Sequence, residues 1–143
     1  MDYLTILPDW QERLAAANLA DLDSLLEFSE GKCMSWHLRG KTSLFELPCG
    51  QNIFIKQDNY TKYQRIVRSI VRFKRAEPNT ERERQCLLLA NSYGITVPEV
   101  IAWGQRRRGC LPDKGVMVML PMDGVALDEY VKNEPNIEKR QEA

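Results

Sequence analysis

The sequence contains one histidine and no closely spaced pair of cysteines. The single histidine, His37, excludes a histidine-rich metal site, and the four scattered cysteines indicate neither a disulfide framework nor a zinc site. The chain does not open with a basic stretch followed by an apolar one, and no apolar run reaches membrane-spanning length. These absences lead us to expect a soluble, cytoplasmic protein whose thiols are reduced.

Neither sign of charge is in excess, but the charges are unevenly distributed. The 143 residues carry 20 basic and 20 acidic side chains, and 43% of them are hydrophobic, which is typical of a globular domain with its own core. Residues 56–84 hold nine Lys or Arg against four Asp or Glu, whereas residues 1–55 hold four against eight. A basic middle section suits an anionic ligand, although charge alone favours a solvated basic surface.

The first half of the chain predicts two helices followed by three antiparallel strands. Trp10 and Leu14 share one stripe of a helix that Asp9 would cap and Asn18 would end, and a shorter helix follows a second cap at Asp21. The strands are expected over residues 32–39, 42–47 and 52–56, with turns at 40–41 and 48–51. This order predicts a three-stranded meander.

The second half predicts a helix, two more strands and a final helix. The helix is expected over residues 80–94, with Gly94 as the glycine that ends it. The strands are expected over residues 100–103 and 116–120, separated by a basic turn and a loop. Because residues 116–120 are almost entirely apolar, we expect this strand to be central in the sheet. Residues 121–124 break the pattern before a last helix that begins near residue 127.

A basic amphipathic segment precedes the helix at residue 80. Residues 66–75 interleave Arg and Lys with apolar side chains, which favours a surface helix with an apolar underside over a membrane-surface or anionic-substrate contact. Nucleic-acid binding by residues 62–75 ranks low, because Tyr63 and Phe73 are its only interleaved aromatic residues. We therefore expect no nucleic-acid partner.

Lys56 and Glu83 are the residues that point most directly to chemistry. Lys56 closes the apolar strand at residues 52–56, and Glu83 lies in the first turn of the helix on a stripe with Leu87 and Ala90. A carboxylate on an apolar stripe needs a partner, and a strand lysine paired with a helix glutamate clamps ATP phosphates in kinases. The simpler alternatives are a capping box of Thr80 with Glu83 and an ordinary lysine at a strand end.

The ordered set of motifs resembles the small lobe of a protein-kinase-like fold. Within that class the chain resembles the lipopolysaccharide kinase family, the Kdo and heptose kinases of the inner core. The most specific likeness is Glu83 followed by Leu87, then Gly94-Ile95 and Pro98, as in the family's Glu-x3-Leu helix that ends in Gly-Ile/Val-x-x-Pro. Residues 40–45 resemble the family's first turn, and residues 54–56 its aromatic-x-Lys strand.

The resemblance implies an α+β fold. It predicts a five-stranded antiparallel sheet, a helix that bears the glutamate, and additional N-terminal helices. It divides the chain into a helical extension over residues 1–31, an N-lobe over 32–120, and a hinge with the start of a C-lobe helix over 121–143. The remaining C-lobe is then expected to be absent from this chain.

The resemblance also implies ATP and Mg²⁺ as cofactors. Lys56 and Glu83 take the catalytic positions, with Glu83 holding Lys56 against the α- and β-phosphates. The residues implied in nucleotide binding are Gly40, Lys41, Thr42, Lys56, Leu120 and Met122. No metal ligand is assigned, because no His-x-Asp catalytic motif and no Asp-x-Gly magnesium motif follow the hinge in this sequence.

The activity implied is ATP-dependent phosphorylation of a sugar of the lipopolysaccharide inner core. The expected location is cytoplasmic, with peripheral contact with the inner membrane as a further option. The alternative is a non-catalytic module that binds a nucleotide or a partner and transfers nothing. Such a module would leave exposed the apolar surface that a large lobe covers in a kinase.

Overall fold

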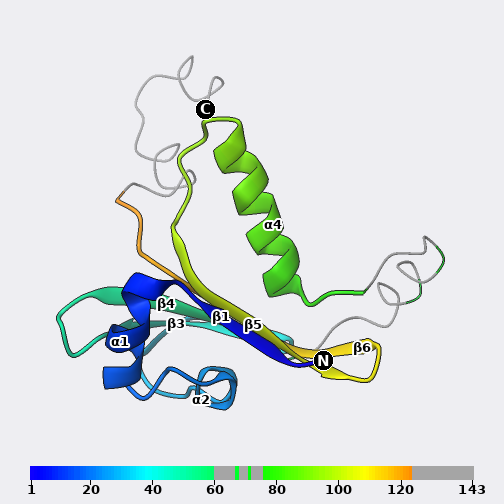
Figure 1. Ribbon diagram of the computed structural model, residues 1–143, viewed down its shortest axis with the longest axis horizontal. Helices are drawn as coiled ribbons and strands as arrows, with labels where there is room; N and C mark the ends of the chain where they lie inside the picture. The colour runs from blue at the N-terminus through cyan, green and yellow to red at the C-terminus, as the bar shows by residue number, and fades with distance from the viewer. Residues whose placement is uncertain (60–66, 68–70, 72–75, 124–143) are drawn as a thin grey trace.

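Six antiparallel strands form the centre of the fold, and helices lie on both faces of the sheet (Figure 1). The computed structural model describes residues 1–59, 67, 71 and 76–123. In their order across the sheet the strands are β1 (Tyr3–Ile6), β5 (Val100–Arg108), β6 (Leu111–Met119), β4 (Asn52–Asp58), β3 (Gly40–Glu46) and β2 (Lys32–His37). The described helices are α1 (Pro8–Ala16), α2 (Leu22–Leu26) and α4 (Asn79–Ser92).

The hydrophobic core lies between the sheet and the two N-terminal helices. Trp10 and Leu14, one helical turn apart on α1, are buried, as the sequence stripe predicted. The strands contribute alternate residues such as Ile53 and Ile55, which contact the core while their neighbours point to the other face. Each fully buried aliphatic side chain of this kind contributes roughly 1.5–3 kcal/mol to folding.

The prediction of five strands was wrong, because β1 adds a sixth. Tyr3–Ile6 pairs with β5 in an antiparallel register that places Tyr3 opposite Gln105 and Thr5 opposite Trp103. The strand alternates between exposed and half-buried residues and ends before Pro8. A run of four residues is too short for its alternation to stand out, so only its pairing with β5 defines it. The stretch expected to be a helical extension therefore also supplies one strand.

The ends of α1 and α2 show which capping predictions hold. The prediction of Asp9 as the cap of α1 was wrong, because Leu7 is the N-cap and Pro8, with its fixed φ, begins the helix. Asn18 ends α1 as predicted, with φ 57° in the left-handed region. The Asn18 and Leu19 amides bond back into the last turn of α1, which is a Schellman arrangement. Asp21 caps α2 as predicted, accepting from the Ser24 amide at 2.9 Å.

Helix α4 begins without the capping box that was the simpler alternative for Glu83. Its N-cap is Pro78, and the first helical amide, that of Asn79, donates instead to the Asp58 carboxylate at the end of β4 (2.6 Å). Glu83 is consequently the fifth residue of the helix and lies in its second turn. The end was predicted correctly, because Gly94 has φ 78° and its amide donates to Asn91.

Several strand boundaries differ from the predicted ones. Gly40 starts β3 rather than forming a turn, so the first strand ends at His37 and the chain reverses at residues 38–39. Lys56 does not close its strand, because β4 continues to Asp58. Strands β5 and β6 pair along their whole lengths as far as Arg108 and Leu111, where a basic turn and a loop were expected. Continuous backbone pairing extends these strands beyond the apolar residues that signal them.

The meander and the central strand are as predicted. Strands β2, β3 and β4 are consecutive antiparallel neighbours, and the turn at residues 48–51 joins the last two, with φ 84° at Gly50. Strand β6 lies between β4 and β5, and its consecutive residues Val116, Met117 and Val118 are all buried. Burial of consecutive strand residues means that both faces of β6 are covered.

Two predicted features lie outside the described residues. These are most of the basic segment at residues 62–75 and the last helix from residue 127 onwards. Within the segment, Val67 and Val71 are described, and both are exposed. No helix among the described residues combines the length and the apolar character needed to cross a membrane.

Gln57 connects the sheet to the end of α2, which yields a stability prediction. Its buried amide lies 2.9–3.0 Å from the carbonyl oxygens of Leu25, Leu26 and Phe28. Gln57→Leu leaves these carbonyls without that donor, so we expect unfolding free energy to fall by about 1–3 kcal/mol in urea denaturation. Gln51→Leu is the matched control, because the Gln51 amide bonds only to its neighbour Asn52 at the surface. Equal losses in the two variants would contradict this role of Gln57.

Candidate functional site

The alternation of β4 places Lys56 on the face of the sheet that carries α4. Ile55 and Gln57 point into the core on the opposite face, so Lys56 between them points away from it. In register, Lys56 lies opposite Thr42 on β3 and opposite Met117 on β6. The lysine therefore stands in the middle of the sheet and not at its edge.

Lys56 and Glu83 form the ion pair that the sequence predicted. The Lys56 Nζ atom lies 2.8 Å and 2.5 Å from the two carboxylate oxygens of Glu83. Both side chains remain partly accessible, at 31% and 37% relative exposure. An ammonium group has three N–H donors, so a lysine held in this way can still donate to a second anion. The pairing is confirmed, whereas its use on phosphate stays a prediction.

The three residues predicted to cover the phosphates divide between the two faces. Thr42 shares the face of Lys56, its cross-strand partner. The Lys41 side chain points to the opposite face, where its Nζ donates to the Phe28 carbonyl (3.3 Å). On the Lys56 face, Lys41 can therefore contribute only backbone groups. Gly40 is required by packing, because a Cβ there would lie 2.3 Å from the Gln57 carbonyl oxygen.

The two residues predicted to contact adenine follow the end of β6. The Leu120 amide donates to the Glu99 carbonyl (2.9 Å), which fixes the chain next to the start of β5. Leu120 also packs against the core, while Met122 is 50% exposed. Met119 pairs with Phe54, two residues from Lys56, so the structure brings this segment to the sheet end nearest Phe54.

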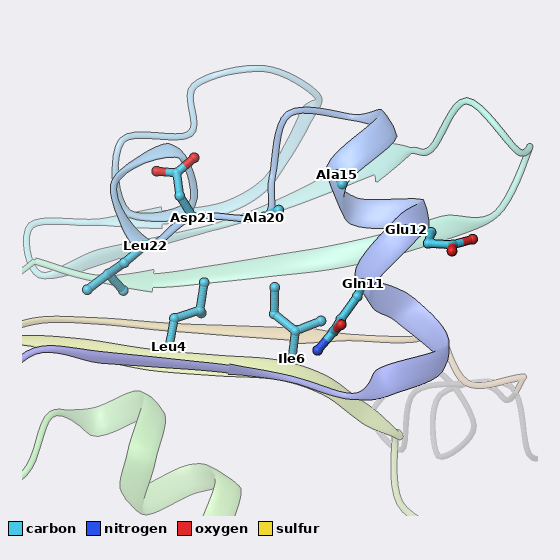
Figure 2. Close-up of a pocket in the computed structure, with 8 residues that line it drawn as sticks. All are labelled: Leu4, Ile6, Gln11, Glu12, Ala15, Ala20, Asp21 and Leu22. Carbon is cyan, nitrogen blue, oxygen red and sulfur yellow. The ribbon is translucent and has the colours of Figure 1, made fainter.

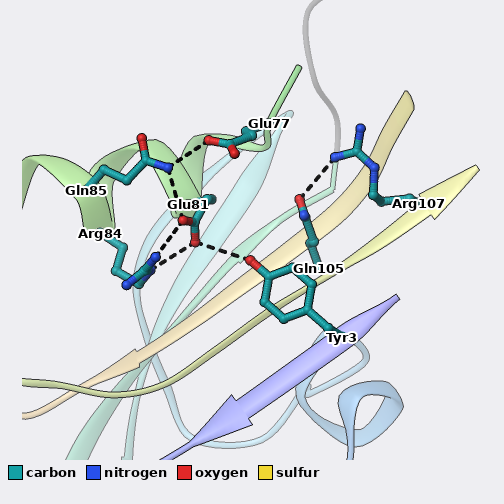
Figure 3. Close-up of polar contacts among 7 residues, drawn as sticks. All are labelled: Tyr3, Glu77, Glu81, Arg84, Gln85, Gln105 and Arg107. Carbon is teal, nitrogen blue, oxygen red and sulfur yellow. Dashed lines mark hydrogen bonds and ion pairs between the residues drawn. The ribbon is translucent and has the colours of Figure 1, made fainter. Parts of the chain in front are cut away.

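A second polar cluster, which the sequence analysis missed, surrounds Glu81 (Figure 3). The Arg84 guanidinium donates to both carboxylate oxygens of Glu81, at 2.9 Å and 2.7 Å. The Gln85 amide (3.1 Å) and the Tyr3 hydroxyl (3.5 Å) also donate to this carboxylate. Arg84 lies over the ring of Trp103, 4.6 Å from its centroid, in a cation–π contact. The Glu81/Arg84 spacing was a visible signal for the ion pair, but nothing local indicated Tyr3 or Trp103.

Ionisation in this cluster follows from burial and hydrogen bonding. Burial opposes the charge of Glu81, but hydrogen bonds from Arg84 and Gln85 outweigh it and lower the pKa of Glu81. Burial, reinforced by the nearby Glu81 charge, raises the pKa of Tyr3. The hydrogen bond to Glu81 raises the pKa of Arg84. The cluster therefore holds the buried Glu81 carboxylate as an anion through its hydrogen-bond partners.

Among the described residues, two of the cavities lie away from Lys56. One, of about 600 Å³, lies between β1, α1 and α2 on the opposite face of the sheet (Figure 2). Its lining is Leu4, Ile6, Gln11, Glu12, Ala15, Ala20, Asp21 and Leu22. The charged side chains in this lining are two carboxylates, which do not suit phosphate. The other, of about 320 Å³, lies between α4 and the start of β5 and includes Arg84 and Trp103.

The residues described do not fit a magnesium site. Within ranges 1–59 and 76–123, with residues 67 and 71, no three His, Cys, Asp or Glu side chains are grouped to hold a metal. Lys56, Thr42 and the accessible face around them fit an anionic phosphate group better than a cation. The described residues therefore provide no ligand set for Mg²⁺.

Comparison with known proteins shows a shared fold. No protein-family model and no curated protein matches the sequence. The solved structure of WaaP in complex with acyl carrier protein matches with a TM-score of 0.58 and 16% identity. The match covers 92% of this chain and 46% of the WaaP chain, so this chain spans about half the length of its neighbour. The chain thus shares its α+β fold with WaaP, and its sheet has six strands where five were predicted.

The two glutamates of α4 are expected to differ in their effect on stability. Glu81 is buried and paired, so Glu81→Ala leaves Arg84 half-buried without its anion and should cost about 3 kcal/mol. Glu83 is more exposed, and Glu83→Ala should cost about 1 kcal/mol or less. Urea denaturation of both variants measures the difference. A larger loss of unfolding free energy in Glu83→Ala than in Glu81→Ala would contradict this prediction.

The lowered pKa of Glu81 predicts a component of acid denaturation. The folded protein binds the Glu81 proton less tightly than the unfolded chain, so this stability is present above the usual value near 4.5 and is lost as pH falls through the folded pKa. Glu81→Gln removes that component. Unfolding free energies between about pH 5 and about pH 3 should therefore fall less steeply in Glu81→Gln than in the parent protein. Parallel pH profiles would assign acid sensitivity to other groups.

Proposed function

We propose that this chain is the nucleotide-binding lobe of a kinase and that it binds ATP through Lys56. The observation that carries this proposal is the Lys56–Glu83 ion pair, which joins a central strand to a helix in a fold shared with WaaP. A strand lysine held by a helix glutamate is the arrangement that places positive charge on the α- and β-phosphates in kinases.

Each proposed residue has a defined task in nucleotide binding. Lys56 neutralises phosphate charge, and Glu83 keeps the lysine extended so that little reorganisation accompanies binding. Thr42, across from Lys56 on β3, and the backbone of Gly40 and Lys41 lie beside the phosphates. Leu120 and Met122 contact adenine at the end of β6.

The parent reaction that we propose is ATP-dependent phosphorylation of a sugar of the lipopolysaccharide inner core. The sequence motifs at Glu83 and Gly94 and the likeness to WaaP support it. Transfer also needs groups that position the sugar hydroxyl and hold magnesium, and neither motif for these tasks follows the hinge in this sequence. We propose a cytoplasmic location, with peripheral contact with the inner membrane.

A non-catalytic binding module is the second candidate. Leu88, Leu89, Tyr93 and Ile95 are exposed on α4 and the residues that follow it, which gives a partner an apolar surface to cover. WaaP itself has been solved with acyl carrier protein bound. This candidate predicts nucleotide or partner binding without phosphoryl transfer to a lipopolysaccharide acceptor, whereas the kinase lobe predicts transfer when a complete large lobe is present.

Calorimetric titration of the chain with ATP in the presence of Mg²⁺ tests the nucleotide assignment. We expect Lys56→Met to weaken ATP binding at least about tenfold, because a charged hydrogen bond to phosphate contributes about 1.5–3 kcal/mol. Lys114→Met is the matched control. Its position next to Gly115, whose α-carbon faces Thr80 of α4, places Lys114 on the other face of the sheet. If Lys56→Met binds ATP as tightly as the parent protein, the proposed site is wrong.

A further inference from the structure

Helix α4 is attached to the sheet mainly by polar groups. Its buried residues are Thr80 and Glu81, both in the first turn. Leu88 and Leu89 are more than half exposed, so the second half of α4 contributes little apolar burial. A helix that packs through an apolar stripe is held by burial of that stripe, but the stripe residues Leu87 and Ala90 of α4 are only partly buried. Specific side-chain contacts must therefore set its orientation.

The start of α4 has a fixed point of attachment. The Asn79 amide donates to Asp58 on β4, and Gly115 on β6 leaves room for Pro78 and Thr80. A Cβ at residue 115 would lie 2.3 Å from the Thr80 hydroxyl oxygen, so the first turn lies directly on β6. These contacts fix the position of the first turn of α4. Other groups must set the rotation and tilt of the turns that follow.

Glu81 and Glu83 lie on opposite flanks of α4. Residues in an α-helix are separated by about 100°, so Glu81 and Glu83 project from nearly opposite flanks of α4. Glu83 reaches β4 through Lys56, while Glu81 and Arg84 reach β1 and β5. Figure 3 shows Tyr3 pointing from β1 towards Glu81 on the helix. The helix is thus held from both flanks.

We propose that Tyr3, Glu81, Arg84 and Trp103, together called the α4 latch, position α4 so that the Glu83 carboxylate meets Lys56. Arg84 is its central residue, because it both pairs with Glu81 and lies over Trp103. Without Arg84, the buried Glu81 carboxylate loses its counter-charge and must become hydrated. Movement of the second turn towards solvent then carries Glu83 away from Lys56. The effect on ATP, unlike the effect on the ion pair, rests on the proposed function.

Lysine acylation with an N-hydroxysuccinimide ester, resolved by mass spectrometry, tests the latch without nucleotide. An ion-paired lysine reacts slowly, so Glu83→Gln should raise the labelling rate of Lys56 relative to Lys114 in the same sample. Arg84→Gln should raise it at least about threefold. Arg82→Gln is the matched control, because Arg82 is exposed on the neighbouring position of α4. Trp103→Phe keeps an aromatic face under Arg84 and should restore most of the protection that Trp103→Leu loses.

The double variant Glu83→Gln/Arg84→Gln distinguishes positioning from general loosening. If Arg84 acts through Glu83, labelling of Lys56 in the double variant equals that in Glu83→Gln alone. The proposal is overturned if Arg84→Gln leaves the labelling rate of Lys56 unchanged. It is also overturned if Arg84→Gln raises that rate by the same factor in Glu83→Gln as in the parent protein. Circular dichroism and urea midpoints identify any unfolded variant, and Trp103→Leu then provides the second test.

ATP titration of the same variants separates this inference from the proposed function. Arg84→Gln should weaken ATP binding at least about threefold in the parent background and not at all in Glu83→Gln. If Lys56→Met shows no role in ATP binding but the labelling pattern holds, the nucleotide assignment fails and the latch stands. If ATP binding depends on Lys56, and Arg84→Gln changes neither ATP binding nor Lys56 labelling, the nucleotide assignment stands and the latch fails.

Discussion

The alternation of side chains along β4 is the constraint that determines the contacts on both faces of the sheet. Lys56 and Gln57 are adjacent and must point to opposite faces of the sheet. Gln57 bonds to three carbonyls at the end of α2, while Lys56 bonds to Glu83 on α4. A one-residue slip of β4 would move each side chain to the other face, which would turn Lys56 towards the core and Gln57 towards the face that carries α4. The register that secures the core therefore also places the candidate site.

Much of the fold could be predicted because it is encoded in short ranges of sequence. The apolar run around Val118 indicated a central strand, and Asn18 and Gly94 marked helix ends because few other residues adopt a positive φ. Lys56 and Glu83 could be paired from sequence alone because each is a charge on an otherwise apolar pattern, and such charges require partners. In each case the physical reason lies within a few residues of the signal.

The remaining features depend on contacts between distant parts of the chain. Tyr3 meets Glu81 across 78 residues, and β1 becomes a strand only because β5 offers it a free edge. The start of α4 is capped by Asp58 from another element, so the capping box suggested by Thr80 and Glu83 does not form. The resemblance of residues 40–45 to the family's first turn implies that Lys41 lies at the phosphates. Once Gly40 begins a strand, alternation directs Lys41 to the other face.

The two faces of the sheet are held together by different forces, and this difference bears on function. Helices α1 and α2 bury leucine and tryptophan against the sheet, an attachment that is insensitive to small changes in charge. Helix α4 depends on two carboxylates, one beneath Arg84 and one beside Lys56. Polar contacts are directional, so they fix an orientation sharply when complete and lose it when one partner leaves. Because α1 and α2 are held by apolar burial and α4 by polar contacts, a change in those polar contacts can release Lys56 from Glu83 while the core stays intact.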